Sequence, residues 1–337
     1  MSKVEYKFFL CDTDKVYQEI GAKVLLEDLQ KMVVIRHLET RAESAYQHGK
    51  VGGFFHSSAG QEAIATSLVR VFGNKHWYTT TYRCHALAYL LGISEKEIMA
   101  ELYGKEVGNA KGRGGSMHLF SDRLLGGLAI VGGHIPIATG AAFSLKYQGR
   151  QDLVSLCFLG DGAVAQGAFH ESLNLASLWN LPCVYIIENN LWGMGTHVSR
   201  AICKQPIAES FAPGYGIKSY TLNGMDYFNC YAGFQHIYRE IVVEKRPILV
   251  EVVGERFRGH SISDPALYRT KGELQEAMKK DPLLQLRDRL IREKALTAEE
   301  YQKMDKEVRE RVIDVMKYAQ ESLDPNPISL EEGVFAP

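Results

Sequence analysis

Two short apolar runs joined by one helix-length segment restrict most strongly what this chain can fold into. The first run covers residues 153–159 and ends in Gly-Asp-Gly at 160–162, and the second covers residues 183–187 and ends in Glu-Asn-Asn at 188–190. The residues between them, to about Trp179, have a helical pattern. A strand, a helix and a strand with no room for a hairpin form a right-handed crossover between parallel strands.

The same alternation of strands and helices continues on both sides of this unit. Apolar segments at residues 217–222 and 248–253 predict two more strands, separated by a helix from about 226 to 245. Toward the N-terminus we expect helices at residues 24–47 and 61–71 and a strand at residues 76–81. The chain therefore predicts an α/β fold with a doubly wound parallel sheet and helical N- and C-terminal extensions.

The chain divides into three expected parts. Residues 1–20 predict an N-terminal arm, residues 21–270 the α/β domain, and residues 271–337 a charged, helical C-terminal extension. Within the domain, residues 104–116 hold five glycines and three basic residues, which indicates a loop suited to an anion or a partner chain. The small residues that begin at Gly140 predict a helix that packs closely against another helix.

Composition excludes several classes of partner. Lys and Arg total 39 against 40 Asp and Glu, so the chain lacks the positive charge that binding to nucleic acid or an anionic membrane surface requires. The longest apolar runs are too short to span a bilayer. The six cysteines include no C-x-x-C pair, and the first residues resemble neither a signal peptide nor a transit peptide. We therefore expect a cytoplasmic protein with reduced thiols.

Polar side chains follow both strands of the crossover, at the sheet edge where ligands bind. Asp161 and Asn190 supply a carboxylate and an amide oxygen, which suit Mg²⁺ together with substrate phosphate oxygens. Gly160 and Gly162 let a phosphate approach the backbone, and the N-terminus of the following helix favours negative charge. A dinucleotide site would need G-x-G-x-x-G, whereas the next glycine here is Gly167, and no G-x-x-x-x-G-K-[ST] loop exists.

At this point the motifs resemble those of a known family. Gly-Asp-Gly, the 26 residues 163–188 and then Asn-Asn match the thiamine diphosphate motif. Further matching segments are TYRCH (81–85), GNAKGRGGSMH (108–118), AIVGGHIP (129–136), WGMGT (192–196) and RGHSISDP (258–265). Over about residues 25–320 the chain is similar to the α subunits of thiamine diphosphate-dependent 2-oxo acid dehydrogenases, of the pyruvate type. The resemblance implies the sheet of the thiamine diphosphate-binding fold.

The resemblance also implies roles for individual residues. The implied ligands of Mg²⁺ are Asp161, Asn190 and the main-chain carbonyl of Trp192. The implied diphosphate ligands are the amides of Gly162 and Ala163 and the side chains of Tyr82 and Arg83. The residues implied to lie along the aminopyrimidine are Ala129 and Val131. The family usually has Tyr in place of Trp192 and Gly in place of Ala129, so the second change affects how closely the cofactor ring approaches.

Three histidines are implied to face the reacting carbon: His56, His85 and His260. His260 also follows the strand that ends near Val253, which places it at the ligand edge and among the cofactor-binding residues. Protonated histidines, His260 above all and then His56, are expected to stabilise the developing alkoxide and to supply protons. The implied reaction is decarboxylation of a 2-oxo acid and transfer of the remaining acyl group to a lipoyl arm.

The implied partners are a β subunit and a lipoyl-bearing acyltransferase core. The chain has one Gly-Asp-Gly…Asn-Asn unit and no second α/β half, so the pyrimidine-binding half is expected on a separate β chain in an α₂β₂ assembly. Residues 211–217 leave open a branched-chain 2-oxo acid or acetoin enzyme as one alternative. A second alternative is a non-catalytic scaffold that binds the multienzyme core. Ser261 and Ser263 resemble a regulatory phosphorylation loop, although an ordered substrate-side loop is the favoured interpretation.

Overall fold

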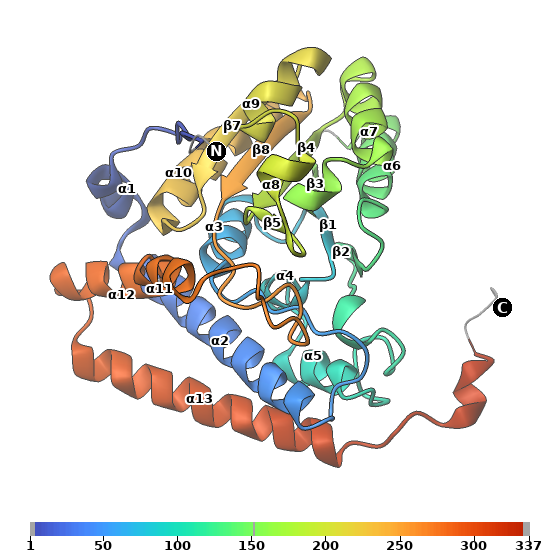
Figure 1. The fold of residues 1–337 in the computed structure, drawn as a ribbon, viewed down its shortest axis with the longest axis vertical. Helices are drawn as coiled ribbons and strands as arrows, with labels where there is room; N and C mark the ends of the chain where they lie inside the picture. Colours follow the sequence, from blue (N-terminus) through green and yellow to red (C-terminus); the bar gives the residue numbers. More distant parts are fainter. Residues whose placement is uncertain (1–3, 151, 333–337) are drawn as a thin grey trace.

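The computed structural model describes residues 4–150 and 152–332, and within them a six-stranded sheet forms the centre of the molecule (Figure 1). The strand order is β2-β1-β3-β4-β8-β7, and every neighbouring pair is parallel. The strands are β1 (Trp77–Thr81), β2 (Leu124–Leu128), β3 (Ser155–Gly160), β4 (Cys183–Asn189), β7 (Lys218–Asn223) and β8 (Ile248–Val253). The predicted α/β fold with a doubly wound parallel sheet is confirmed.

Helices cover both faces of the sheet, because successive residues of each buried strand point to opposite sides. Along β3, Leu156 and Phe158 join the larger core cluster, while Cys157 and Leu159 join the second cluster on the other face. The larger cluster is covered by α2 (Ala22–Gln47), α3 (Glu62–Phe72), α4 (His85–Leu90), α5 (Glu95–Leu102) and α10 (Tyr227–Glu244). The second is covered by α6 (His134–Tyr147), α7 (Gly167–Leu178), α8 (Val198–Ala201) and α9 (Ile207–Phe211).

Two segments differ from the expectation. Residues 13–20 form helix α1 (Thr13–Ile20), and Val16, Tyr17 and Ile20 are buried in the larger core cluster, so this part of the expected arm is a packed element. The side chain of Asp12 caps the helix by accepting hydrogen bonds from two main-chain amides of its first turn. Strand β2 was not expected, because its sequence Leu-Leu-Gly-Gly-Leu carries no alternating pattern.

The C-terminal part of the chain is helical, as its charged sequence indicates. It contains α11 (Lys271–Lys279), α12 (Pro282–Arg292) and α13 (Ala298–Glu321), and α13 lies along α2 and α5 (Figure 1). Arg36 of α2 pairs with Glu62 of α3 and with Asp281 at the start of α12, with 2.8 Å between Arg36 Nη1 and Asp281 Oδ2. This ion-pair network ties the C-terminal helices to the domain. None of the helices in the described residues is long and apolar enough to cross a membrane.

Candidate active site

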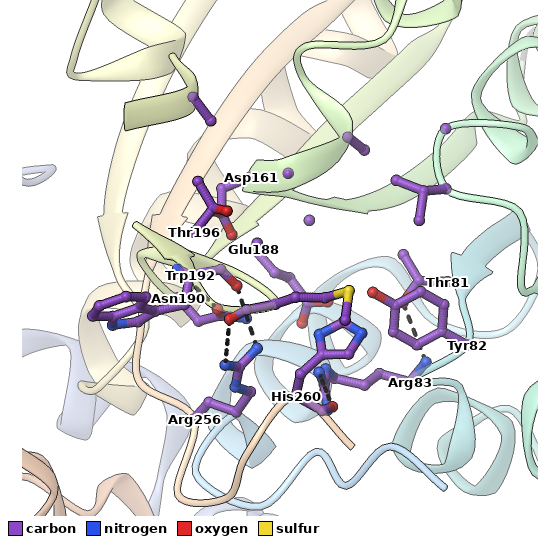
Figure 2. Close-up of a pocket in the computed structure, with 18 of the residues that line it drawn as sticks. Thr81, Tyr82, Arg83, Asp161, Glu188, Asn190, Trp192, Thr196, Arg256 and His260 are labelled. Carbon is purple, nitrogen blue, oxygen red and sulfur yellow. Dashed lines mark hydrogen bonds between the residues drawn. The ribbon is translucent and has the colours of Figure 1, made fainter. Parts of the chain in front are cut away.

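A cavity of about 330 Å³ opens at the carboxyl edge of the sheet (Figure 2). The turns after β1, β3, β4 and β8 reach it, and so does the short hairpin of β5 (Trp192–Gly193) and β6 (Thr196–His197). Parallel strands deliver all these turns to one edge, which is why residues from four distant segments meet here. The cavity therefore lies at the edge of the sheet where the crossover sequence predicts a ligand site.

Asp161 and Asn190 enter the cavity from neighbouring strands. Gly160 of β3 pairs with Glu188 of β4, so the residues that follow each strand lie at the same level. Asp161 is 2% exposed and Asn190 7% exposed, and both line the cavity. Burial raises the pKa of the Asp161 carboxyl to about 6, although main-chain hydrogen bonds and the charge of Arg256 oppose the shift. Because burial disfavours the ionised form of this carboxyl, a cation bound beside it would stabilise the carboxylate.

The hairpin brings the Trp192 carbonyl to the same region. Gly193 lies against the Gly-Asp-Gly turn so closely that a Cβ on Gly162 would be 3.3 Å from the Gly193 Cα. The Trp192 carbonyl accepts a hydrogen bond of 3.3 Å from Arg256 Nη1. The described residues contain no group of three His, Cys, Asp or Glu side chains that could hold a metal. The site instead offers Mg²⁺ one carboxylate, one amide oxygen and one main-chain carbonyl. With so few protein ligands, Mg²⁺ takes its remaining ligands from phosphate and water.

Two buried guanidinium groups line the cavity without a carboxylate partner. Arg83 donates to the carbonyls of Ser57 at 2.7 Å and His260 at 2.8 Å. Arg256, 1% exposed, donates to main-chain carbonyls of the β5–β6 hairpin and to the hydroxyl of Tyr268, as Figure 2 shows for the hairpin contacts. Neither arginine forms an ion pair within residues 4–150 and 152–332, and Arg256 Nε has no hydrogen-bond partner there.

The unpaired charge of these arginines points to an anionic ligand. Burial lowers the pKa of Arg83, and burial together with the charge of Arg83 lowers the pKa of Arg256 to about 10. Guanidinium groups match the geometry of phosphate oxygens, and an anion in the cavity would compensate both charges. The residues present therefore fit a diphosphate held together with a divalent cation. Sequence reasoning missed Arg256, although its place three residues after β8 was a usable signal.

His260 lies in the cavity wall and His56 lies behind it. His260 packs edge-on against the rings of Tyr82 and His56, with centroid distances of 5.6 Å and 5.1 Å. Burial and the charges of Arg83 and Arg256 lower the pKa of His260 to about 4. Burial and the charge of Arg83 lower the pKa of His56 to about 2. Without a bound anion both rings are thus neutral at pH 7, which differs from the expectation that they are protonated.

His85 is not among the residues that line the cavity. Its Nδ1 lies 3.2 Å from Glu39 Oε1 and its Nε2 lies 2.8 Å from the Ser116 carbonyl, while the ring of Phe55 stacks on it. Both ring nitrogens are therefore occupied by protein groups. This location differs from the expectation that His85 faces the reacting carbon.

The other expected residues divide in the same way. The cavity lining includes Tyr82, Val131, Gly162 and Ala163. Ala129 is not in the lining, where Leu128 takes part instead. The helix after Gly-Asp-Gly also begins later than expected: Asp161–Ala163 form a 3₁₀ turn, and α7 starts only at Gly167. The main-chain amides nearest the cavity are consequently those of the 3₁₀ turn.

Glu188 is a second cavity residue that sequence reasoning did not single out. It is the next-to-last residue of β4, and Figure 2 shows its side chain directed into the cavity near His260. Burial raises the pKa of its carboxyl to about 7, and the charge of Arg83 opposes the shift. The Glu-Asn-Asn sequence at the strand end was the available signal.

The segment after β8 folds back over the hairpin. The Tyr268 hydroxyl accepts from Arg256 Nη2 at 2.8 Å and donates to Asp264 Oδ2 at 2.5 Å, and the same oxygen of Asp264 accepts from the His260 amide at 2.7 Å. The Tyr268 ring lies 4.9 Å from that of Trp192. Arg256, His260 and the hairpin are thereby held in one hydrogen-bonded unit.

Comparisons with known proteins show the family to which the chain belongs. The family model described as "Dehydrogenase E1 component" matches residues 30–328. The chain is 40% identical over 313 residues to "Pyruvate dehydrogenase E1 component subunit alpha" of Rhizobium meliloti, covering 92% of this chain and 89% of the relative. It is 36% identical over 312 residues to the protein of that name from Rickettsia bellii, covering 92% and 95%. The somatic mitochondrial form of Homo sapiens is 38% identical over 309 residues, covering 91% and 77%.

Proposed function

The chain belongs to the dehydrogenase E1 component family, a family of 2-oxo acid dehydrogenase enzymes, and we propose that it is the α subunit of a pyruvate dehydrogenase. In this proposal it uses thiamine diphosphate and Mg²⁺ to decarboxylate pyruvate oxidatively, and the acetyl group passes to a lipoyl arm of an acyltransferase. The observation that carries the proposal is the cavity itself, where Asp161 and Asn190 face two unpaired buried guanidinium groups.

The chain's own residues would bind the cofactor at three places. Asp161, Asn190 and the Trp192 carbonyl would hold Mg²⁺, and the amides of Gly162 and Ala163 would meet the diphosphate. Arg83 and Arg256 would neutralise the diphosphate charge. Burial raises the pKa of Tyr82, so its hydroxyl keeps its proton and donates. When bound, thiamine diphosphate supplies a nucleophilic carbon and an electron sink for decarboxylation.

His260 is the residue that we propose to act on the substrate. Its ring nitrogens have no hydrogen-bond partner among the described residues, so they are available to a bound 2-oxo acid. A bound anion would offset the charges of Arg83 and Arg256 and raise the pKa of His260 toward its ordinary value. The ring could then donate a proton to the developing alkoxide.

Activity is proposed to require a β subunit in an α₂β₂ assembly. In support, the chain carries a single Gly-Asp-Gly…Asn-Asn unit, and large apolar side chains are exposed along α6 and α7. These exposed side chains are Ile137, Phe143, Tyr147, Leu178 and Trp179. Apolar surface of this kind is what a permanent subunit contact covers.

Reconstitution with candidate β chains tests the proposed function. We expect the chain alone to show negligible decarboxylation at saturating thiamine diphosphate and Mg²⁺, and the complex to prefer pyruvate over 2-oxoisovalerate and acetoin. Preference for either of the other substrates would replace pyruvate with the branched-chain or acetoin alternative. Absence of Mg²⁺-dependent cofactor binding by the complex would favour a non-catalytic scaffold. The cytoplasmic location stays a prediction that cell fractionation would test.

A further inference from the structure

A buried carboxylate outside the cavity contacts both sides of the structure that holds Arg83. Glu39 lies on α2 and is 1% exposed, and its Oε1 accepts a hydrogen bond of 2.6 Å from Ser58 Oγ. The same oxygen lies 3.2 Å from Nδ1 of His85, which is 4% exposed. One oxygen atom therefore joins the segment before α3 to the first residue of α4.

Both of these contacts involve residues close in sequence to Arg83 or to the carbonyl that accepts from it. Ser58 follows Ser57, whose carbonyl accepts the hydrogen bond from Arg83 Nη1. His85 comes two residues after Arg83 and is the first residue of α4, so its contact with Glu39 anchors the chain close to the arginine. Two of the segments that position the guanidinium group thus share one anchor, the Glu39 carboxylate, while the His260 carbonyl accepts from Arg83 Nη2 on the other side.

His85 is itself held from the other side. Its Nε2 lies 2.8 Å from the Ser116 carbonyl and 2.9 Å from the Ser116 hydroxyl, and its Nδ1 faces the Glu39 carboxylate. His85 and Glu39 form a buried pair, and Ser116 connects this pair to the glycine-rich loop at residues 104–116.

Burying the charged carboxylate of Glu39 is energetically unfavourable. Its Oε2 is buried and has no hydrogen-bond partner among the described residues. Burial alone would raise the pKa of this carboxyl, but the charge of His85 and the hydrogen bonds of His85 and Ser58 hold it below its ordinary value. A neutral side chain would fill the space without this desolvation, so the carboxylate is kept for what it orients.

We propose that Glu39 is a positioning residue, which holds Arg83 in the ligand cavity through Ser58 on one side and His85 on the other. The inference rests on the proposed function only in taking Arg83 as a ligand of the cofactor diphosphate. Glu39 does not touch the cavity, so its effect is on where the guanidinium group lies. It gives His85 a role that does not require contact with the reacting carbon.

The test compares Glu39→Gln with Glu27→Gln in the full-length chain. Glu27 lies on the same helix in an exposed ion pair with Arg70, which makes it a matched control. The first readout is calorimetric affinity for inorganic diphosphate with Mg²⁺. Glu39→Gln removes the charge that strengthens both contacts of Oε1, and we expect at least about 10-fold weaker binding, the value of one hydrogen bond to a charged group. Glu27→Gln should stay within about twofold of the parent chain, because a surface ion pair contributes little.

The second readout needs no ligand and separates positioning from stability. With ¹⁵N-labelled Arg and His, we expect the Arg83 Nε and His85 ring resonances to move in Glu39→Gln and to stay in place in Glu27→Gln. Ser58→Ala removes one donor only, so it tests the same point if Glu39→Gln fails to fold. Unchanged Arg83 resonances together with unchanged diphosphate affinity would overturn the inference. A parent chain that binds no diphosphate would instead count against the proposed function, while the resonances would still decide the role of Glu39.

Discussion

Asp161→Asn should make the ligand-free protein more stable at pH 8 while removing its response to metal and cofactor. The carboxyl of Asp161 is 2% exposed, and burial raises its pKa from 3.8 to about 6. The difference of roughly two pKa units corresponds to about 3 kcal/mol, by which the ionised form is less favourable in the folded chain than in the unfolded chain. Asparagine has nearly the same shape and carries no charge, so it avoids this penalty.

The raised pKa of Asp161 determines the pH range in which Asp161→Asn increases stability. A carboxyl with a raised folded-state pKa leaves stability intact below its unfolded pKa, and the stability is lost as pH rises through the folded pKa. The gain from Asp161→Asn should therefore be absent near pH 4, grow between pH 4 and pH 6, and stay constant above about pH 7. Thermal unfolding followed at pH 4.5 and pH 8 without ligand measures it, with exposed Asp122→Asn as the control.

The same experiment with Mg²⁺ and thiamine diphosphate completes the prediction. The parent protein should gain thermal stability from the two ligands together, because a ligand that binds only the folded state stabilises it. Asp161→Asn should lose most of that gain, since one proposed ligand of the cation has lost its charge. A variant that is less stable than the parent at pH 8, or that keeps the full ligand response, would refute the reasoning.

Three further perturbations follow from the contacts. Glu188→Gln should flatten the pH dependence of inorganic diphosphate binding measured without metal. In the parent protein the affinity should fall from pH 6 to pH 8, because a carboxyl with a pKa of about 7 ionises beside Arg83. An equally steep fall in the variant would contradict this role. Arg36→Met should lower the free energy of unfolding by about 3 kcal/mol in urea, because it leaves Glu62 and Asp281 without their partner; a loss below about 1 kcal/mol would show that the network contributes little. Tyr268→Phe should weaken cofactor binding about 10-fold and speed tryptic cleavage after Arg258, since Arg256 and Asp264 lose their bridge; an unchanged cleavage rate would argue against a tied loop.

The sequence predicted those parts of the fold whose pattern is local. The apolar run of β3, the turn residues after it and the run of β4 lie within one short stretch, so their crossover follows from chain geometry. The bounds of β8 agree with its β-branched run, residues 248–253. Strand β2 could not be predicted because its sequence, with two glycines, carries no alternating pattern, and in the structure it pairs with β1.

Residues of the candidate site could be predicted where they directly follow a strand. They could not be predicted where tertiary packing decides which way the side chain points. Asp161 and Asn190 were found from strand position alone. Arg256 and Glu188 also lie at strand ends, but arginine and glutamate are usually solvated, and only burial shows that theirs are not. His85 is the opposite case, since its neighbour Arg83 enters the cavity while α4 turns His85 toward Glu39.

Asp161 and Asn190 are proposed to hold a divalent ion that binds a diphosphate. The most direct measurement is anomalous diffraction from crystals grown with Mn²⁺ and thiamine diphosphate, because Mn²⁺ accepts the same oxygen ligands as Mg²⁺ and is located by its own signal. We expect one strong peak within about 2.2 Å of an oxygen of each residue. A peak elsewhere, with clear cofactor density and both side chains directed away from it, would contradict the account.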